Sequence, residues 1–505
     1  MYIDRKLKMI KTVFFLSLFT VMFLVAFHVE RHSCMGIPLI KENELKNYTE
    51  DFVINIEELR FNNEKIAADI KDNLIFISQS KENLKHSFLL EGILKSQNPR
   101  HKLFFLEDEV IEDLELAVQK GRTLSLIVIS DMSMQKIEVA LTTLPMVRLE
   151  GEVIGENERG REIFKGKIIV SAGKDPLTNS YSMKTSEVEW NIRGGSTSEM
   201  GKKSWKLSLK NKSGENNNLE FLGMGADDDW ILNSMVLDDT RMKEKLFMDL
   251  WNQIANGSKH NYKASNGNYV EVVVNGDYRG VYMLQRRLDD KYLALGEEDV
   301  LLKAGGYDKE TVEEAYELVS NLSETSQIYS FMQQILTGSD CSDINIENLI
   351  DINIMLQLVS ARDNYDMLNM YYVLKEDADD YEIFLVPWDT DQSMGVVYKG
   401  GDGFTYDYQL AMEEMGERCE TEAVRRIIYQ YDDMAKNRWN YLKKSIISEH
   451  NIFPMIESME EALENSGALY RDRDKWDLLY GGQDNVKNMK KFLIERCDVL
   501  DNYYN

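Results

Sequence analysis

The chain has 505 residues, of which 86 are Asp or Glu and 59 are Lys or Arg, giving a formal net charge of −27. This length predicts two or more domains and an ample hydrophobic core. The strongly acidic balance argues against nucleic acid as a partner, and it is compatible with cation binding or with basic protein substrates.

The N-terminus combines several basic residues with an uncharged apolar run, Thr12–Phe27. The run lies between the core of a signal peptide and the roughly 18 residues of a comfortable membrane span. Lys11 can snorkel and extend the span, and no small-x-small cleavage motif follows. We predict that residues 1–36 form an uncleaved single-pass membrane anchor, with a cleaved signal peptide as the alternative. Basic residues before the run keep that end cytoplasmic, so the rest of the chain is expected to be extracytoplasmic.

Short apolar runs separated by polar turns fill residues 37–146. They predict a small β-rich module, in which Lys65–Asp69 and the segment Leu74–Ser78 form a strand pair. No catalytic pattern is visible in this region. We therefore expect a spacer or binding module whose ligand the sequence does not name.

From residue 147 onward, longer strand patterns carry the first candidate phosphate ligands. In Ser204–Lys210, Trp205 and two leucines share one face, whereas Lys206 lies on the other. A Gly- and Ser-rich loop follows Arg193, and its amides and hydroxyls could meet phosphate oxygens, although its spacing is not that of a P-loop. Lysines on such a strand can act as point charges toward phosphate, or they can simply be solvated.

A helix and a hairpin are predicted next. Asp238 or Asp239 is a good N-cap for the helix. One face of this helix is apolar and consists of Leu246, Phe247, Leu250, Trp251 and Ile254. Asn275-Gly276-Asp277 predicts the turn of a following β-hairpin, and Leu301–Ala304 reads as a further short strand.

The stretch over residues 364–395 carries the clearest chemistry. Two apolar runs, Met370–Leu374 and Ile383–Val386, are joined by a polar turn and predict a hairpin. This hairpin would bring together residues at its entrance and exit, namely Asp366, Asn369, Asp389 and Asp391. Three carboxylates and an amide oxygen suit a hard cation such as Mg²⁺ held with phosphates. Ordinary loop aspartates are the alternative, but clustered like charges are costly without a cation.

The C-terminal part has the periodicity of helices. One apolar face is expected on Val424, Ile427, Ile428 and Tyr431, and Leu442, Ile446 and Ile447 continue it. Another helix is expected to run to Leu463 with Pro454 in its first turn. These helices would support the predicted hairpin and form a mainly α-helical C-terminal lobe.

Taken together, these blocks resemble the CotH protein family, the spore-coat kinases with an atypical kinase-like fold. The resemblance spans about residues 145–400 and rests on five motifs in order: IRGGSTSEMGKKSWKLSLK, DDWILNSMVLDDTRMKEKL, YVEVVVNGDYRGVYMLQRRLDDKYL, LLKA and NYDMLNMYY…FLVPWDTDQSMG. It implies an α+β, kinase-like domain over residues 147–505, with a β-rich N-lobe and a helical C-lobe. The chain departs from the family at Lys243, where an arginine is usual, and at Gln285, where a glutamate is common. The HRD and GxGxxG motifs of ordinary kinases are absent.

The resemblance also implies a reaction, the transfer of the γ-phosphoryl group of ATP to Ser or Thr of a protein with Mg²⁺ or Mn²⁺. Asp366 then takes the place of the catalytic base, Asp389 that of a metal ligand, and Asn369 and Asp391 those of auxiliary ligands. The expected nucleotide-binding residues are Arg193, Lys203, Lys206, Gln285 and Lys303. The candidate substrate is a coat or envelope protein that contains Ser or Thr. A basic protein of this kind would suit the negative charge of the chain.

Two other functions stay open at this point. A pseudokinase that serves as a structural scaffold in a coat or envelope would keep the fold without needing the aspartates for turnover. A metal-dependent hydrolase is disfavoured, because only six histidines are present and no His–carboxylate ligand set is evident. If the N-terminal signal were cleaved, the protein would be secreted or located in the spore coat instead of anchored.

Overall fold

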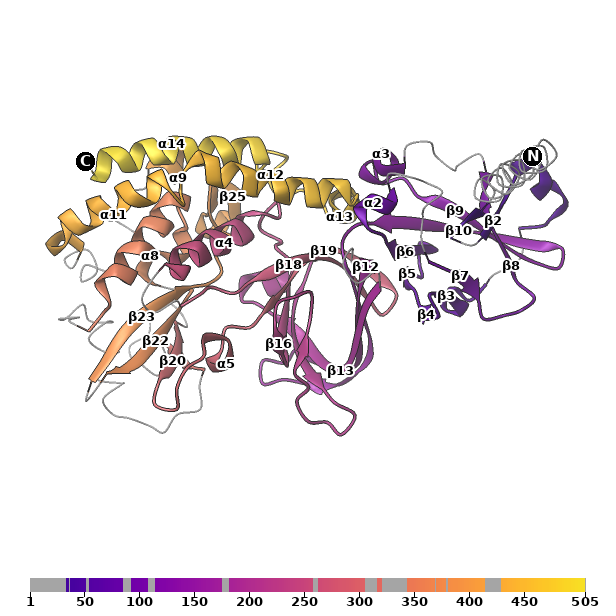
Figure 1. Cartoon of the computed structure of the whole chain (residues 1–505), viewed down its shortest axis with the longest axis horizontal. Coiled ribbons are helices and arrows are strands. Elements are labelled where there is room, and N and C mark those ends of the chain that lie inside the picture. The colour runs from indigo at the N-terminus through magenta and orange to yellow at the C-terminus, as the bar shows by residue number, and fades with distance from the viewer. Residues whose placement is uncertain are drawn as a thin grey trace, which may run out of the picture.

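The computed structural model describes residues 33–35, 37–50, 54–84, 92–107, 114–174, 181–257, 262–304, 316–319, 343–367, 369–377, 380–413 and 428–504. The fold mixes helices and strands, which confirms the predicted α+β class. Figure 1 shows a sheet module at the N-terminus, a barrel in the middle and a helix-covered sheet beyond it. The apolar run Thr12–Phe27 lies outside the described ranges, and no helix within them is long and apolar enough to cross a membrane.

The N-terminal module is built on a seven-stranded sheet. Its strands lie in the order β1 (Ser33–Cys34), β2 (Ile37–Ile40), β8 (Lys102–Leu106), β9 (Leu124–Ser130), β10 (Ser133–Thr142), β6 (Leu74–Ser78) and β5 (Ala67–Asp69). The predicted pair is confirmed, since β5 runs antiparallel to β6. A second sheet contains β3 (Leu59–Phe61), β4 (Glu64–Lys65) and β7 (Leu94–Ser96), and the short helices are η1 (Glu42–Asn47), η2 (Ile56–Glu58), α2 (Lys81–Leu84) and α3 (Leu114–Gln119).

A hairpin of the central barrel holds this module in place. The ring of Phe76 stacks on that of Tyr278, with centroids 4.7 Å apart. The Asp69 carboxylate accepts a hydrogen bond of 3.0 Å from the Tyr278 amide, and the Ile70 amide donates to the Gly276 carbonyl over 2.8 Å. Apolar stacking and backbone hydrogen bonds therefore fix the module on the barrel.

Seven strands form a closed barrel. They are β11 (Met146–Glu156), β12 (Glu162–Lys174), β13 (Tyr181–Arg193), β14 (Ser204–Lys210), β17 (Asp229–Asn233), β19 (Asp277–Arg286) and β18 (Gly267–Val274). A parallel pairing of β11 with β18 closes the ring, so that no edge strand remains. The alternation predicted for β14 is confirmed, because Trp205, Leu207 and Leu209 are buried in the barrel core and the residues between them are not. Around the barrel lie η5 (Ser196–Glu199), β15 (Leu219–Glu220) and β16 (Ala226–Asp227).

Two predicted hairpins are present in the structure. Asn275 and Gly276 have φ values of +48° and +74° between the paired residues Val274 and Asp277, as a two-residue turn of type I′ requires. The second hairpin pairs β22 (Met370–Asp377) with β23 (Asp380–Pro387). It belongs to a four-stranded sheet with β20 (Val300–Ala304), which was predicted, and β21 (Tyr316–Leu318), which was not.

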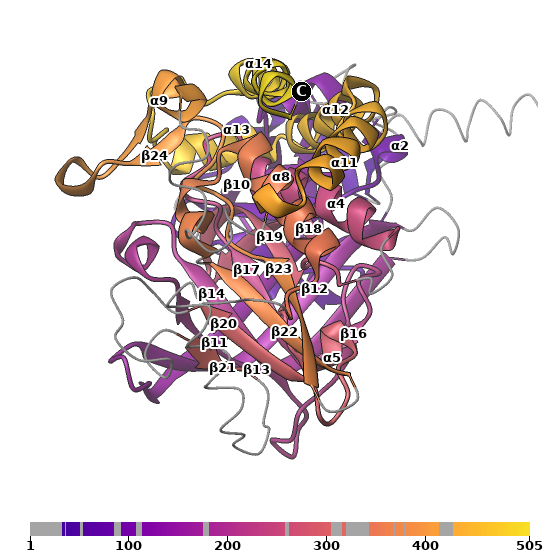
Figure 2. The same ribbon diagram turned by 90° about the vertical axis from the view of Figure 1, so that its left-hand side faces the viewer.

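Helices pack on this four-stranded sheet (Figures 1 and 2), and the C-terminal helices extend toward the N-terminal module (Figure 1). They are α4 (Lys243–Asn256), α5 (Asp290–Leu293), α8 (Ile346–Val359), α9 (Tyr408–Glu413), α11 (Asp432–Lys444), α12 (Glu449–Asn465), α13 (Ala468–Lys475) and α14 (Val486–Tyr504). Between them lie η6 (Arg362–Met367), β24 (Val396–Tyr398), η7 (Gly400–Asp402) and β25 (Phe404–Tyr406). Their apolar faces form the largest hydrophobic core of the molecule.

The apolar face predicted for α4 is confirmed, whereas Tyr431, predicted on the apolar face of a later helix, is exposed, and two helix starts differ from the prediction. All five apolar residues predicted on α4 are buried. Its N-cap is Met242, and Asp238 instead accepts a 2.8 Å hydrogen bond from the amide of Lys243, the first helical residue. Helix α12 begins at Glu449, because the Ile452 amide already bonds to the Ser448 carbonyl, and Pro454 therefore lies beyond the first turn. Val424 and Ile427 lie outside the described residues, whereas Ile428, Leu442 and Ile447 are buried.

A buried carboxylate joins the helical part to the barrel. Asp472 of α13 accepts hydrogen bonds from Lys202 (2.6 Å), Arg241 (3.0 Å) and the Val281 amide (2.8 Å). Gly280 permits this approach, because a Cβ at that position would lie 2.1 Å from the Asp472 carboxylate. Burial by itself would raise the pKa of Asp472, but the charges of Lys202 and Arg241 outweigh it and hold that pKa below its ordinary value. The carboxylate is therefore ionised and shared by two buried basic side chains, Arg241 and Lys202, and burial lowers the pKa of Lys202 to about 7.

Candidate functional site

The open end of the β22–β23 hairpin brings Asn369 and Asp389 together. Asn369 before β22 and Asp389 after β23 both have left-handed backbones, with φ values of +50° and +57°. Asn and Asp tolerate this conformation better than other residues with side chains. The Trp388 amide donates to the Asn369 carbonyl over 3.1 Å, so the two ends are held side by side.

The side chain of Asn364 stabilises this arrangement through hydrogen bonds. Its side chain is fully buried, and its amide nitrogen donates to the carbonyls of Asn369 (3.2 Å) and Trp388 (2.8 Å). One side chain therefore links the residue before the first strand to the residue after the second. This positioning role is visible only in the folded chain.

We expect Asn364→Asp to lower the free energy of unfolding by about 1–3 kcal/mol, because a carboxylate cannot donate to two carbonyl oxygens. Urea denaturation of the purified chain measures this loss. Asn437→Asp on the exposed face of α11 is the matched control and should leave the midpoint nearly unchanged. Equal midpoints for the two variants would contradict the role of Asn364.

Four carboxylates gather beside the hairpin end: Glu244, Asp363, Asp389 and Asp391, which we call the acidic group. Burial raises the pKa of Asp391 well above its ordinary value, and the negative charges of Asp389, Glu244 and Asp363 raise it further. Asn369 donates its amide to Asp363 over 2.5 Å. Burial also raises the pKa of Asp363, with Asp389 as the next cause. The carboxylates of the acidic group therefore repel one another when ionised, which favours either protonation or a bound cation.

Glu244 reaches this group from helix α4 and was not predicted as a site residue. Asn233, at the end of β17, donates to the Glu244 carboxylate over 2.7 Å and so fixes its orientation. Burial raises the pKa of Glu244 to about 8; the charge of Asp389 adds to the rise, and that of Arg193 opposes it. The only signal in the sequence was an acidic residue in the first turn of an amphipathic helix.

Basic side chains interact electrostatically with the acidic group. Burial lowers the pKa of Lys303 on β20, the charge of Arg193 lowers it further, and Asp389 acts in the opposite direction. The Arg193 guanidinium lies over the Trp388 ring, 5.3 Å from its centroid. Two cations predicted for phosphate thus stand next to a predicted metal ligand.

Lys206 and Arg287 extend this basic side. The Arg287 guanidinium lies 3.1 Å from the Asp229 carboxylate, and the Lys206 ammonium lies 3.9 Å from it. Burial lowers the pKa of Lys206, which Asp229 opposes and Arg287 reinforces. Arg287 also lowers the pKa of Lys303, so all four cations interact. We call Arg193, Lys206, Arg287 and Lys303 the basic group, and Arg287 is a member that the sequence did not point out.

The remaining predicted residues take different positions. Lys203 donates to the Ser198 carbonyl over 2.6 Å and is thereby held at the η5 loop. Gln285 is fully buried on β19 in the cross-strand row that contains Ile231 and Lys206, and within the described residues neither atom of its amide has a hydrogen-bond partner. The backbone of Asp366 lies in η6, whereas its side chain falls outside the described part of the chain.

The donor chemistry of the acidic group fits a divalent cation. Across the described residues, no group of three or more His, Cys, Asp or Glu side chains is placed to hold a metal ion by itself. Mg²⁺, however, usually takes one or two carboxylates, and substrate phosphates and water complete its shell. Asp389 and Asp391 would hold such an ion, and the neighbouring basic group supplies charges of the opposite sign for the phosphates.

Comparison with protein families gives an independent result. The family model described as CotH kinase protein matches residues 191–500. The match begins in β13, later than the resemblance seen in the motifs, and continues through the helices to α14. No curated protein matches the chain. The family match covers more than half of the chain and includes both groups of charged residues, and the chain therefore belongs to the CotH family.

Proposed function

We propose that this protein is a protein kinase that transfers the γ-phosphoryl group of ATP to a Ser or Thr hydroxyl. The observation that carries the proposal is the electrostatic interaction between the two charged groups, in which the pKa of Lys303 responds to both Arg193 and Asp389. A nucleoside triphosphate with a divalent cation needs both signs of charge within a few ångströms. The barrel and the helix-covered sheet would serve as the two lobes of a kinase-like domain.

The residues divide the reaction among them. Arg193 and Lys303 would attract phosphate oxygens, with Lys206 and Arg287 next to them, and Gln285 would line the nucleotide side. Asp389 and Asp391, with Asn369, would hold a divalent cation, which neutralises charge on the phosphates when it is bound. Asp366 would accept the proton of the substrate hydroxyl as its oxygen bonds to the γ-phosphorus. The bond from that phosphorus to the β–γ bridging oxygen breaks, and ADP leaves.

The cellular setting is part of the same proposal. Residues 1–36 would anchor the chain in a membrane and residues 37–146 would form a separate β-rich module, with the kinase domain outside the cytoplasm. A basic coat or envelope protein is the proposed substrate, because the chain carries a net charge of −27. A structural scaffold that has lost catalysis is the second candidate, since the GxGxxG and HRD motifs are missing.

Replacement of one basic side chain, Lys303, tests the proposal. The full-length chain, in mild detergent with Mn²⁺ and labelled ATP, should phosphorylate protamine, a basic protein that contains serine. Lys303→Met should raise the KM for ATP about 10–100-fold, because a charged hydrogen bond to phosphate is lost. Lys210→Met, at the far end of β14 where the lysine ammonium bonds to Asn216 in the exposed turn, is the control and should behave like the wild type. A wild-type chain that binds ATP but transfers no phosphate to protamine or casein would favour the scaffold.

A further inference from the structure

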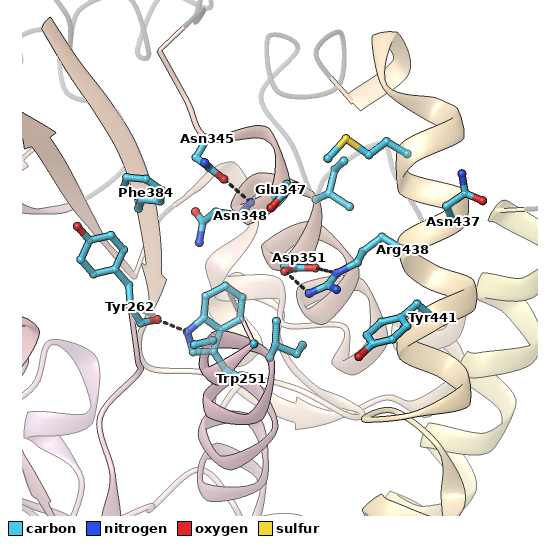
Figure 3. A pocket seen from close by; sticks show the side chains of 15 residues that line it. Trp251, Tyr262, Asn345, Glu347, Asn348, Asp351, Phe384, Asn437, Arg438 and Tyr441 are labelled. Atoms are coloured by element: carbon cyan, nitrogen blue, oxygen red, sulfur yellow. Dashed lines mark hydrogen bonds and ion pairs between the residues drawn. The ribbon is translucent and has the colours of Figure 1, made fainter. Parts of the chain in front are cut away.

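A separate cavity of about 340 Å³ lies between helices α4, α8 and α11 and strand β23. None of its lining residues belongs to the acidic or basic group. Its volume falls within the range of pockets that bind small molecules. Figure 3 shows side chains from all four elements facing this space.

Aromatic rings form much of the wall. Trp251 comes from α4, Phe384 from β23 and Tyr441 from α11, and Tyr262 lies next to Phe384 with ring centroids 4.9 Å apart. The Trp251 indole nitrogen donates to the Tyr262 carbonyl over 3.1 Å, so its one donor is already used. The Trp251 and Phe384 rings therefore offer a ligand apolar surface and π faces.

Two of the charged residues that line the cavity, Asp351 and Arg438, form an ion pair with each other. Arg438 donates two hydrogen bonds, of 2.6 and 2.8 Å, to the two oxygens of Asp351, and Figure 3 shows the pair meeting across the pocket. The guanidinium also lies 5.4 Å from the centroid of the Tyr441 ring. The Asp351 carboxylate and the Arg438 guanidinium therefore neutralise each other, and neither needs a charged ligand as its counter-ion.

The remaining lining charge is negative. Glu347, in the first turn of α8, is exposed at the cavity, and within the described residues no Lys, Arg or His forms an ion pair with it. Its charge raises the pKa values of Asp351 and Arg438, although burial and the Asp351–Arg438 contacts are the larger causes. Burial raises the pKa of Tyr262 to about 12, with Asp299 and Glu382 as further causes. Glu347, Asp351 and Arg438 are the charged residues among those described that line the cavity, and their net charge is negative.

We propose that this cavity binds a small organic ammonium ion with an apolar body. The ammonium group would pair with Glu347, and the body would lie among Trp251, Phe384 and Tyr441. Aromatic faces attract organic cations as well as apolar groups, which makes one ligand class suit both features of the wall. An anionic ligand would face Glu347 and find the guanidinium of Arg438 already occupied.

The walls of the cavity connect it to the candidate site. Helix α4 carries Trp251 two turns after Glu244, α8 leads into η6 with Asp363, and β23 leads from Phe384 to Asp389. A ligand that shifts any of these elements would alter the geometry of the acidic group and so the affinity of the site for nucleotide. By thermodynamic linkage, bound nucleotide would then change the affinity of the cavity for its ligand. This coupling rests on the proposed function, whereas binding of the ammonium ion does not.

Three probes of one shape test the binding. Phenethylammonium, 2-phenylethanol and 3-phenylpropionate share an aromatic body and differ in charge, and ligand-observed NMR titration of the full-length chain without nucleotide measures each Kd. For so small a ligand we expect a Kd of about 1 mM for the ammonium ion. The alcohol should bind at least about threefold more weakly and the carboxylate more weakly still.

Two variants localise the probe. Glu347→Gln and Tyr441→Leu change exposed side chains and should each weaken phenethylammonium binding about two- to fivefold. Glu158→Gln, in the exposed turn between β11 and β12, is the control and should leave the Kd unchanged. Equal Kd values for the three probes, or for Glu347→Gln and the wild type, would overturn the site. Binding that leaves the Kd for ATP unchanged would overturn the coupling alone, and failure of ATP itself to bind would count against the proposed function and leave the cavity result intact.

Discussion

Asp389→Asn should slow phosphoryl transfer by about 10²–10³-fold, the loss typical when one charged group that stabilises a transition state is removed. Asp389 interacts with members of both charged groups: it raises the pKa values of Asp391, Glu244 and Asp363, and it attracts Lys303. Asparagine keeps the size of the side chain and tolerates the left-handed backbone at this position. The substitution therefore removes the charge and leaves the backbone in place.

The same variant should not be less stable than the wild type, because it removes one of several neighbouring like charges. Rates with labelled ATP and urea midpoints, measured on one preparation, separate the two effects. Asp432→Asn, which removes an exposed ion pair with Lys436, is the control for both measurements. Phosphate incorporation by Asp389→Asn at the rate of this control would rule out catalysis through the acidic group.

Asp472→Asn should lower the free energy of unfolding by about 3–5 kcal/mol, because it leaves Lys202 and Arg241 buried without their common counter-ion. Denaturation in urea at neutral pH measures the loss. Asp474→Asn lies on the same helix, α13, but is exposed, and it should change the stability by less than about 0.5 kcal/mol. A loss of less than 1 kcal/mol for Asp472→Asn would mean that the carboxylate does not hold the helical part to the barrel.

This contribution should also depend on pH. The pKa of Asp472 is lower in the folded protein than its ordinary value, so the folded state favours the ionised form. The stabilisation is therefore fully present above the ordinary carboxyl pKa near 4, and it is lost as the pH falls through the lower folded value. The difference in stability between the wild type and Asp472→Asn should narrow below about pH 4.

The hairpins and the helix faces were predictable because their signals are local. The turn Asn275-Gly276 fixes the pairing of the strands on either side of it, and the apolar runs around residues 376–380 fix that of β22 and β23. The alternation in β14 and the apolar stripe of α4 follow from the periods of strand and helix. The nearness of Asn369 to Asp389 needed only the hairpin between them.

Longer-range arrangements had no such signal. The helix start predicted at Asp238 or Asp239 came out at Met242 instead, because Asp238 bonds to the Lys243 amide from outside the helix. Glu244 joins the acidic group only because α4 packs where the hairpin ends, and Arg287 joins the basic group only because β19 lies beside β17. Asn364 was within the quoted stretch, but its two hydrogen bonds depend on a hairpin already formed.

By itself, the sequence determined the family, the α+β class and the two ends of the hairpin that carry Asn369, Asp389 and Asp391, since period, turn chemistry and residue order act over a few residues. Only the tertiary structure decided that seven strands close into a barrel through a parallel β11–β18 contact, that Glu244 and Arg287 complete the charged groups, and that Asp472 ties α13 to Lys202. The physical reason is that these contacts join residues far apart along the chain, so their formation depends on how whole elements pack and not on any local pattern.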